Sequence, residues 1–152
     1  MCMIFEDKLD DFFKEFKAGR KMVLSTSYDD YVTSRMMSII QKDGNFYFQT
    51  DKTFRKYNQL IHNKHVALCI DNIQIEGICK ELGHPMENLE FAELYKENFP
   101  NSFHNYTSLP NERLFCITPT YIERWIYIHK MPFLETFHFE KQEYRLQKYQ
   151  LD

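Results

Sequence analysis

The stretch MVLSTSYDDYVTSRMMSIIQKDGNFYFQT, residues 22–50, decides the fold of this chain. It contains three runs rich in β-branched, aromatic and other apolar residues, at 22–27, 32–41 and 46–49. Each run predicts a strand. An Asp-rich turn at Tyr28–Tyr31 separates the first two runs, and the Asp-Gly dipeptide within Lys42–Asn45, a strong hairpin signal, separates the last two. The stretch therefore predicts a three-stranded antiparallel meander.

The residues before the meander predict a helix. Five large apolar residues recur at helical spacing and form one stripe: Phe5, Leu9, Phe12, Phe13 and Phe16. Acidic residues come early in this segment and lysines come late, an order that suits the helix dipole. Gly19 is expected to end the helix, because glycine is common just beyond a helix C-terminus.

The residues after the meander, 50–63, return to helical spacing. Four of them fall on one helix face: Phe54, Tyr57, Leu60 and Ile61. Asp51 or Thr53 is expected to cap the start of this helix, because a side-chain oxygen accepts from the free backbone N–H groups there.

The rest of the chain predicts more strands and one more helix. Val66–Ile70 and Ile73–Leu82 are expected to be strands joined at Asp71-Asn72, and Gly77 suggests a bulge or a close backbone approach. Further on we expect a helix at Glu87–Phe99, a polar loop at 98–111, a long strand at Arg113–Ile128 bent at Pro119, and an edge strand at Leu134–Phe139. No element is assigned to residues 140–152.

Short antiparallel strands with few helices between them favour a mostly β fold, a barrel with peripheral helices. A parallel doubly wound sheet is not expected, because it needs regular alternation of strands and helices. With 152 residues, no internal repeat and no linker, the chain is expected to be one domain over residues 1–152.

Composition and charge narrow the function classes. The net charge is −3, and its 19 basic and 22 acidic residues are interspersed, so no basic stripe favours a nucleic-acid partner. The longest apolar run, Val66–Ile70, is too short to cross a membrane. The N-terminus lacks a charged-then-apolar signal pattern, which favours a cytoplasmic location. The 14 Phe, 10 Tyr and one Trp suit a large dimer interface, a flat ligand pocket, or both.

Neither the cysteines nor the histidines predict a metal site. The four cysteines form no CxxC pair and are expected to be free thiols: Cys2, Cys69, Cys79 and Cys116. His62 and His65 are three residues apart, with Cys69 behind them. Because His62 ends a predicted helix and His65 starts a predicted strand, their side chains need not converge, and no metal is expected.

Four segments, in this order, carry a resemblance to a known family: TSRMMS (33–38), NFYFQT (45–50), DKTFRKY (51–57) and IQIEG (73–77). In order and spacing the chain resembles, from about Lys21 to about Tyr127, the pyridoxamine 5′-phosphate oxidase-like FMN-binding split-barrel proteins. It is most similar to their short members of the general-stress-protein type. The resemblance implies an antiparallel Greek-key split β-barrel and a homodimer that holds FMN between its subunits. It also implies flavin-dependent redox chemistry on a small molecule.

The resemblance further implies which residues bind the cofactor. Ten positions match: Arg35, Met36, Met37 and Ser38 on the second strand, Gln49 and Thr50 at the end of the third, Arg55 and Lys56 at the following helix start, Asn72 just before the strand ending in Glu-Gly, and Trp125 on the late strand. The Arg-Lys pair would clamp the phosphate, and the Trp would lie near the cofactor across the dimer. A phosphomonoester independently favours a helix N-terminus with charge-assisted donors.

Two departures from the family pattern leave alternatives open. Phe54 stands where the family often has a small hydroxyl residue that contacts phosphate. The true oxidases carry an Arg-x-His element, but neither His129 nor His138 has an Arg two residues before it. The alternatives are a true pyridoxamine or pyridoxine phosphate oxidase with a diverged substrate end, a non-enzymatic flavin- or haem-binding module, and a scaffold whose aromatic residues serve only dimerisation. No catalytic acid or base is assigned.

Overall fold

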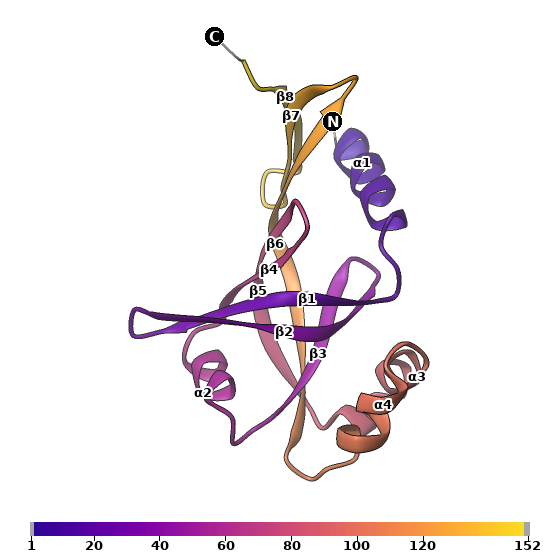
Figure 1. The fold of residues 1–152 in the computed structure, drawn as a ribbon, viewed down its shortest axis with the longest axis vertical. Helices are drawn as coiled ribbons and strands as arrows, with labels where there is room; N and C mark the ends of the chain where they lie inside the picture. Colours follow the sequence, from indigo (N-terminus) through magenta and orange to yellow (C-terminus); the bar gives the residue numbers. More distant parts are fainter. Residues whose placement is uncertain (1, 151–152) are drawn as a thin grey trace.

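The computed structural model of the protein describes residues 2–150, with side chains from residue 4 onward (Figure 1). In chain order its elements are α1 (Cys2–Lys14), β1 (Gly19–Tyr28), β2 (Tyr31–Lys42), β3 (Asn45–Asp51), α2 (Arg55–His62), β4 (His65–Ile70), β5 (Ile73–Gly83), the short turn η1 (Pro85–Glu87), α3 (Leu89–Asn98), α4 (Pro100–Ser102), the short turn η2 (Phe103–Thr107), β6 (Glu112–Ile128), β7 (Met131–His138) and β8 (Glu143–Lys148). The three predicted strands of the meander and the helices on either side of it are confirmed.

Six antiparallel strands close into a barrel in the order β3-β2-β1-β4-β5-β6, and β3 pairs with β6 to complete the ring. The order 3-2-1-4 is that of a Greek key. Beyond the barrel, β6 continues into β7 and β8, which rise together as an arm, with α1 beside its base (Figure 1). The mostly β, antiparallel Greek-key barrel with peripheral helices is therefore confirmed.

Both turns of the meander have the backbone that their residues favour. Asp29 and Asp30, and likewise Asp43 and Gly44, take positive φ angles. Two consecutive residues with positive φ match the twist of a tight antiparallel hairpin. The resulting register runs without a shift from Gly19 opposite Ile40 to Tyr28 opposite Tyr31, so the alternation of side chains between the two faces is fixed along the whole hairpin.

Gly77 lies at an irregularity between β5 and β6, as its position inside a strand predicted. The register shifts between Glu76 and Gly77, and Gly77 pairs with Pro119. A Cβ atom at Gly77 would lie 2.6 Å from Ile117 Cγ2 and 2.8 Å from the Thr118 carbonyl oxygen. Only glycine fits such a close approach of the two strands.

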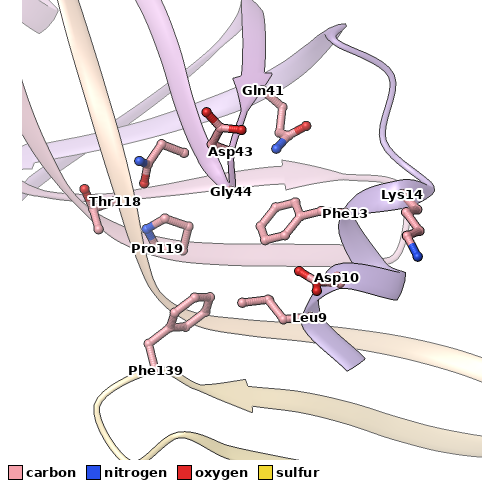
Figure 2. A pocket seen from close by; sticks show the side chains of 11 residues that line it. Leu9, Asp10, Phe13, Lys14, Gln41, Asp43, Gly44, Thr118, Pro119 and Phe139 are labelled. Atoms are coloured by element: carbon pink, nitrogen blue, oxygen red, sulfur yellow. The ribbon is translucent and has the colours of Figure 1, made fainter. Parts of the chain in front are cut away.

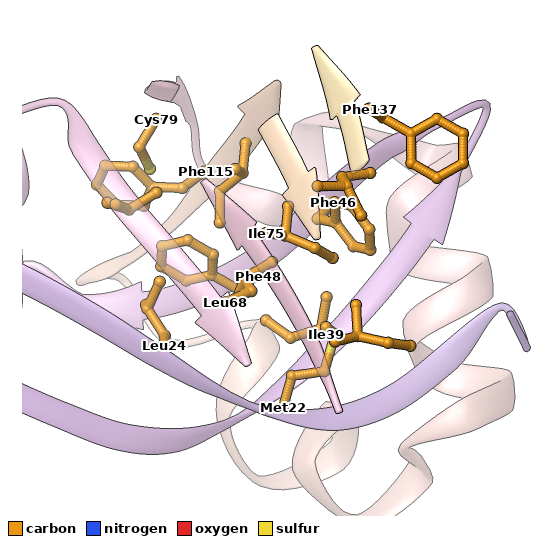
Figure 3. Packing of buried hydrophobic residues seen from close by; sticks show 14 of the residues in the cluster. Met22, Leu24, Ile39, Phe46, Phe48, Leu68, Ile75, Cys79, Phe115 and Phe137 are labelled. Atoms are coloured by element: carbon orange, nitrogen blue, oxygen red, sulfur yellow. The ribbon is translucent and has the colours of Figure 1, made fainter. Parts of the chain in front are cut away.

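The core fills the inside of the barrel with side chains from every second strand position (Figure 3). Leu24, Leu68 and Ile75 are fully buried there. Phe48 of β3 and Phe115 of β6 stack with their ring centroids 5.3 Å apart. Burial of each such side chain contributes about 1.5–3 kcal/mol of hydrophobic stabilisation.

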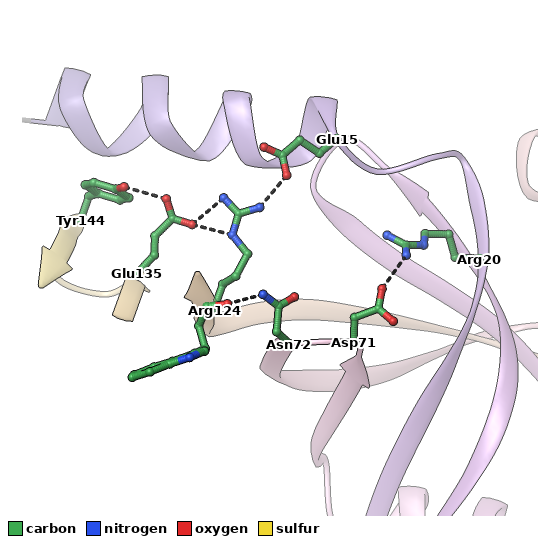
Figure 4. A network of polar contacts seen from close by, with 8 residues as sticks. Glu15, Arg20, Asp71, Asn72, Arg124, Glu135 and Tyr144 are labelled. Atoms are coloured by element: carbon green, nitrogen blue, oxygen red, sulfur yellow. Dashed lines mark hydrogen bonds and ion pairs between the residues drawn. The ribbon is translucent and has the colours of Figure 1, made fainter. Parts of the chain in front are cut away.

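Helix α1 binds the base of the arm through its aromatic stripe and one ionic network (Figure 4). Phe12 packs on Phe137 of β7 at 5.4 Å between ring centroids. Beside it, Arg124 of β6 contacts Glu135 at 2.7 Å and Glu15 at 2.5 Å. Arg124 and Glu135 form a largely buried pair within the arm, and Arg124 joins the arm to the helix through the exposed Glu15.

Gly19 does not end the first helix, contrary to its prediction. Helix α1 ends at Lys14, and Gly19 begins β1. A Cβ atom at Gly19 would lie 2.5 Å from Asn98 Cβ, at the end of α3. This glycine is therefore required for contact between two distant segments, a reason that local sequence patterns do not reveal.

Two predictions for the second half of the chain were also wrong. Residues 98–111, predicted as a polar loop, contain the helical turns α4 and η2, and Pro100 starts the first of them. The predicted edge strand, β7, lies between β6 and β8. Tyr144 explains why β8 pairs there: its ring packs on Phe137 at 5.0 Å, and its hydroxyl donates to Glu135 at 2.7 Å.

Candidate functional site

Three cations from two elements gather where β2 faces the start of α2. Arg35 comes from β2, and Arg55 and Lys56 form the first turn of α2. Burial lowers the pKa of Arg35, and the charge of Arg55 lowers it further. Burial likewise lowers the pKa of Lys56, and the charge of Arg35 adds to that effect. The like charges thus lie close enough to perturb one another, and we name this cluster of Arg35, Arg55 and Lys56 the cationic mouth.

The Arg35 guanidinium is held in place by neutral oxygens. Its Nη1 donates to the Leu24 carbonyl at 3.2 Å and to Thr26 Oγ1 at 2.8 Å, and its Nη2 donates to Thr33 Oγ1 at 2.5 Å. Both threonines also donate to Gln59 Oε1 of α2, at 2.6 and 2.8 Å. This network positions the guanidinium and ties α2 to the barrel without neutralising the charge.

Sequence reasoning missed Thr26, Thr33 and Gln59. Thr26 occupies a buried position in the alternation of β1 and lies opposite Thr33 of β2. Two polar residues facing each other at inward positions of a hairpin were the available signal.

The start of α2 lacks the predicted side-chain cap. The capping position is Phe54, and no side chain there accepts a hydrogen bond from the helix. Asp51 instead accepts from the Thr53 backbone N–H at 2.7 Å and from the Thr53 hydroxyl at 2.6 Å. The prediction failed because these two residues bond to each other in the turn before the helix. The first N–H groups of α2 are consequently left without a side-chain cap, as at helix N-termini that bind anions.

Phe54 has a role other than the phosphate contact that the family often has at this position. Lys56 Nζ lies 4.9 Å from the centroid of the Phe54 ring, within range of a cation–π interaction. The ring itself is exposed. Phe54 thus holds Lys56 by its aromatic face.

The cations of the mouth lack a counter-charge, and a hydroxyl on the preceding strand lacks a hydrogen-bond partner. Within residues 4–150, none of the three cations lies within 4.0 Å of a carboxylate oxygen. Thr50, at the end of β3 just before the loop to α2, is 4% exposed. Among all the described side chains, residues 4–150, the Thr50 Oγ1 is the one buried oxygen or nitrogen without a hydrogen-bond partner. A buried hydroxyl without a partner costs about 1–3 kcal/mol, so Thr50 favours a ligand that bonds to it.

The other predicted residues of β2 and β3 divide between the two faces of the sheet. Met37 packs against the core, whereas Met36, 62% exposed, points outward. Ser38 lies beside the Tyr95 hydroxyl of α3. Gln49 is buried on the face opposite Thr50, and its Oε1 accepts from Thr107 Oγ1 at 2.9 Å.

Asn72 and Trp125 meet each other but not the cationic mouth. The Asn72 carboxamide donates to the backbone carbonyl oxygen of Trp125. In return, the backbone N–H of Trp125 donates to the backbone carbonyl oxygen of Asn72 at 3.2 Å. The turn that holds Asn72 lies at the Gly19 end of β1, where Asp71 pairs with Arg20 (Figure 4). Arg35 lies opposite Leu24, four residues further along β1, which is about 13 Å of strand. We name the pair of Asn72 and Trp125 the turn corner.

Between Lys21 of β1 and Glu76 of β5, part of the outer face of the barrel carries no charged side chain. It consists of outward positions of β1, β2 and β4: Val23, Ser25, Ser27, Val32, Ser34, Met36, Ala67 and Cys69. Val32 and Met36 are 70% and 62% exposed, respectively. We name these eight residues the bare sheet face. Val32 and Met36 are the large exposed apolar side chains of the bare sheet face. Exposed apolar patches mark interaction surfaces more often than solvated ones.

The remaining candidates do not involve the predicted residues. A groove of about 590 Å³ lies between α1 and the barrel, with Phe13 and Pro119 among its walls, and it contains none of the ten (Figure 2). His62 stacks on Tyr28 at 4.5 Å rather than meeting His65. Across the described side chains, no three His, Cys, Asp or Glu residues form a metal-binding group.

Cys69, Cys79 and Cys116 are free, and Cys2 lies outside the described side chains. None of the helices in residues 2–150 is both long and apolar enough to span a membrane.

Comparison with known proteins places this geometry in context. The family model of pyridoxamine 5′-phosphate oxidase matches residues 5–126. General stress protein 26 from Bacillus anthracis superposes with a TM-score of 0.57 at 22% identity, over 77% of this chain and 90% of that one. A pyridoxamine 5′-phosphate oxidase-related, FMN-binding protein from Nostoc punctiforme reaches 0.61 at 13% identity, over 98% and 96% of the two chains. The haem storage protein of Vibrio cholerae reaches 0.59 at 14% identity, over 76% and 89%.

These structures share the fold with this chain. No curated protein sequence gives a significant match.

Proposed function

Because the chain belongs to the pyridoxamine 5′-phosphate oxidase family, we propose that it binds FMN at the cationic mouth and acts as an FMN-dependent oxidoreductase on a small molecule. The observation that carries the proposal is the unpaired set of donors there. Three cations without a carboxylate partner gather at an uncapped helix start, and the orphaned hydroxyl of Thr50 lies five residues before that helix in the chain. A phosphomonoester dianion provides the counter-charge that the cations lack and an acceptor for the hydroxyl.

Each residue of the mouth then has a part in holding the phosphate. Arg55 and Lys56 donate charge-assisted hydrogen bonds, and Thr50 donates its hydroxyl. Arg35, held by neutral oxygens, contributes charge without adjusting its conformation. Bound FMN supplies two-electron redox chemistry, and the protein orients it and excludes competing reactions. We expect the flavin ring to lie against the outward side chains of Met36 and Ser38 and the backbone between them.

We also propose that the site is completed in a homodimer. In one chain about 13 Å of β1 separates the turn corner from the mouth, so the corner does not contact a phosphate held at the mouth. The bare sheet face offers a broad, uncharged surface for a second copy. On the arm, Tyr127 and Tyr149 surround the Trp125 ring and are both exposed, so a partner could cover them. A two-fold dimer would bring the corner of one subunit to the mouth of the other.

FMN is favoured over other flavins because the Nostoc punctiforme protein of the same fold is FMN-binding. Haem is the second ligand to test, because a protein of the same fold is a haem storage protein. The absorption spectrum of the purified protein, with mass spectrometry of any released ligand, separates the two.

The decisive test compares FMN with riboflavin, which lacks the phosphate. We expect the protein to bind FMN at least about 100-fold more tightly, since each charge-assisted hydrogen bond contributes about 1.5–3 kcal/mol. Equal affinities for the two would refute the phosphate role of the mouth. Failure to bind either flavin would refute the flavoprotein proposal and leave the barrel fold standing.

A further inference from the structure

Glu112 opens β6 beside the cationic mouth, and phosphate binding as described gives it no part. It is 6% exposed, and the residue opposite it in the β3–β6 ladder is Asp51. Side chains at such opposed positions typically have Cβ atoms about 5 Å apart. Among the described side chains, no cation lies within 4.0 Å of the Glu112 carboxylate. A buried carboxyl without a direct counter-charge stands next to a second carboxyl.

The ionisable groups around Glu112 come from four segments. Asp51 faces it from β3 and Lys56 from α2. His84 lies between β5 and η1, where its Nδ1 accepts from the Met86 N–H at 3.1 Å and its Nε2 lies 2.8 Å from the Leu109 carbonyl oxygen. Arg113, the next residue of β6, donates to the Pro110 and Glu112 carbonyl oxygens at 2.9 and 2.6 Å.

Lys56 is the cation of this group that also belongs to the mouth, and its pKa responds to the charge of Glu112. Burial, and behind it the charge of Asp51, raises the pKa of Glu112 to about 7, against the opposing effect of Lys56 and His84. Conversely, the charge of Glu112 opposes the lowering of the Lys56 pKa. Near neutral pH the Glu112 carboxyl is poised between its two forms, so another anion close to Lys56 decides which form it takes.

Building on the proposed function, we propose that Glu112 couples anion binding at the mouth to proton uptake: ionised, it balances Lys56 in the ligand-free protein, and it takes one proton from solvent when a phosphate dianion binds there. The step converts a carboxylate and a proton to a carboxylic acid, and no bond to the ligand forms. Glu112 is in this sense a specificity-determining residue: while ionised it competes with an anion for Lys56, and protonation of Glu112 removes that competition.

The sign of the pH dependence follows from this coupling. The complex holds more protons than the free protein, so the affinity for a dianion falls as the pH rises above about 7, by at most tenfold per pH unit. The phosphate itself loses its second proton near pH 6, roughly, so it opposes the effect only on the acid side. Sulfate stays a dianion throughout and reports the protein alone.

The test is calorimetric titration of FMN into the full-length protein between pH 6 and 8.5, in buffers of different ionisation enthalpy. At pH 7 we expect an uptake of about half a proton, because the Glu112 carboxyl is then about half protonated. Glu112→Gln, a neutral isostere, should abolish the uptake. It should bind FMN as the unaltered protein does at pH 6 and about tenfold more tightly at pH 8.5. Glu93→Gln, an exposed carboxyl on α3, is the matched control.

The outcomes separate the two proposals. If FMN binds but the pH slope is the same in Glu112→Gln and in the unaltered protein, the coupling is wrong and the flavin site stands. If FMN binds at no pH, the proposed function itself fails. Asp51→Asn is the second variant: it removes the like charge, keeps the acceptor for Thr53, and should move the proton uptake to lower pH. The same slopes should appear when sulfate competes with FMN.

Discussion

The cationic mouth and the turn corner are both made of residues that the family resemblance assigns to one cofactor site, yet they are built in opposite ways. In the mouth, three cations lack a carboxylate partner, and the nearby Thr50 hydroxyl of β3 lacks a hydrogen-bond partner. In the turn corner, the side chain of Asn72 and the backbone of Trp125 satisfy each other. The cations of the mouth can still pair with an anion, whereas the hydrogen bonds of the turn corner are already satisfied within the chain.

The difference indicates how the binding energy of the site should be distributed. Groups that lack partners in the free protein gain most from a ligand, because they have given up water without compensation. Groups that are already paired gain little and mainly provide shape. Substitutions in the mouth should therefore affect affinity strongly, and those in the corner should affect stability at least as much as affinity.

The largest effect is expected from removing charge at the mouth. Arg55→Ala with Lys56→Ala should weaken FMN binding by at least about 100-fold and leave riboflavin binding unchanged, since two charge-assisted donors are lost. Quenching of flavin fluorescence measures both affinities. The control is Lys64→Ala with Lys80→Ala, which removes two exposed charges away from the mouth. An equal loss in the control pair would mean that only overall charge matters.

Next in size is the effect of separating the mouth from a partner's corner. Val32→Lys places a charge in the bare sheet face at a 70% exposed position that has no part in the flavin wall, so the chain should fold but remain monomeric. Without the partner's corner, FMN affinity should fall by about 10- to 100-fold. Sedimentation velocity gives the oligomeric state. Leu89→Lys, at a 70% exposed position on α3, should change neither property.

Mixed dimers sharpen the same point. A chain with Arg55→Ala and Lys56→Ala and a chain with Trp125→Ala are each impaired, but at different ends of the proposed site. If a site spans two subunits, mixing the two chains should restore tight binding at about one quarter of the sites, because half of the dimers are mixed and each has one intact site. No recovery after subunit exchange would place the whole site within one chain.

Thr50→Val should act in opposite directions on stability and affinity. The substitution removes a buried hydroxyl that lacks a partner and keeps the shape of the side chain. The ligand-free protein should gain about 1–2 kcal/mol of unfolding free energy, while FMN affinity should fall about tenfold. Urea unfolding and flavin titration provide the two numbers, with Thr118→Val as an exposed control. A loss of both would mean that the hydroxyl has a structural partner instead.

These expectations depend on features that the sequence revealed unevenly. The meander could be predicted because strand runs and an Asp-Gly turn are local signals, and Arg55-Lys56 could be placed at a helix start for the same reason. That Arg35 would join them from β2 came only from the family resemblance. Its proximity depends on the barrel closing, which no local pattern specifies.

The unpredicted parts have one physical cause in common, which is contact between distant segments. Position 19 requires glycine because Asn98 of α3 lies against it. Strand β8 pairs with β7 because Tyr144 packs on Phe137 and donates to Glu135. Glu112 gave no signal at all, because its environment is assembled from β3, α2 and the segment after β5. Burial and pairing at such points are properties of the folded chain.

The smallest effect is expected at the turn corner. Asn72→Ala removes the hydrogen bond to the Trp125 carbonyl and should lower the unfolding free energy by about 0.5–1.5 kcal/mol. FMN affinity should fall only about two- to fivefold, because the side chain is already paired before the ligand arrives. Asn63→Ala is the control: it loses the hydrogen bond to Ser27 at the far end of β1 and the one from the His65 backbone N–H, so it should cost at least as much stability. If Asn72→Ala weakened FMN binding as strongly as the double substitution at the mouth, the carboxamide would have to leave Trp125 and bind the flavin directly, and the two regions would no longer differ in kind.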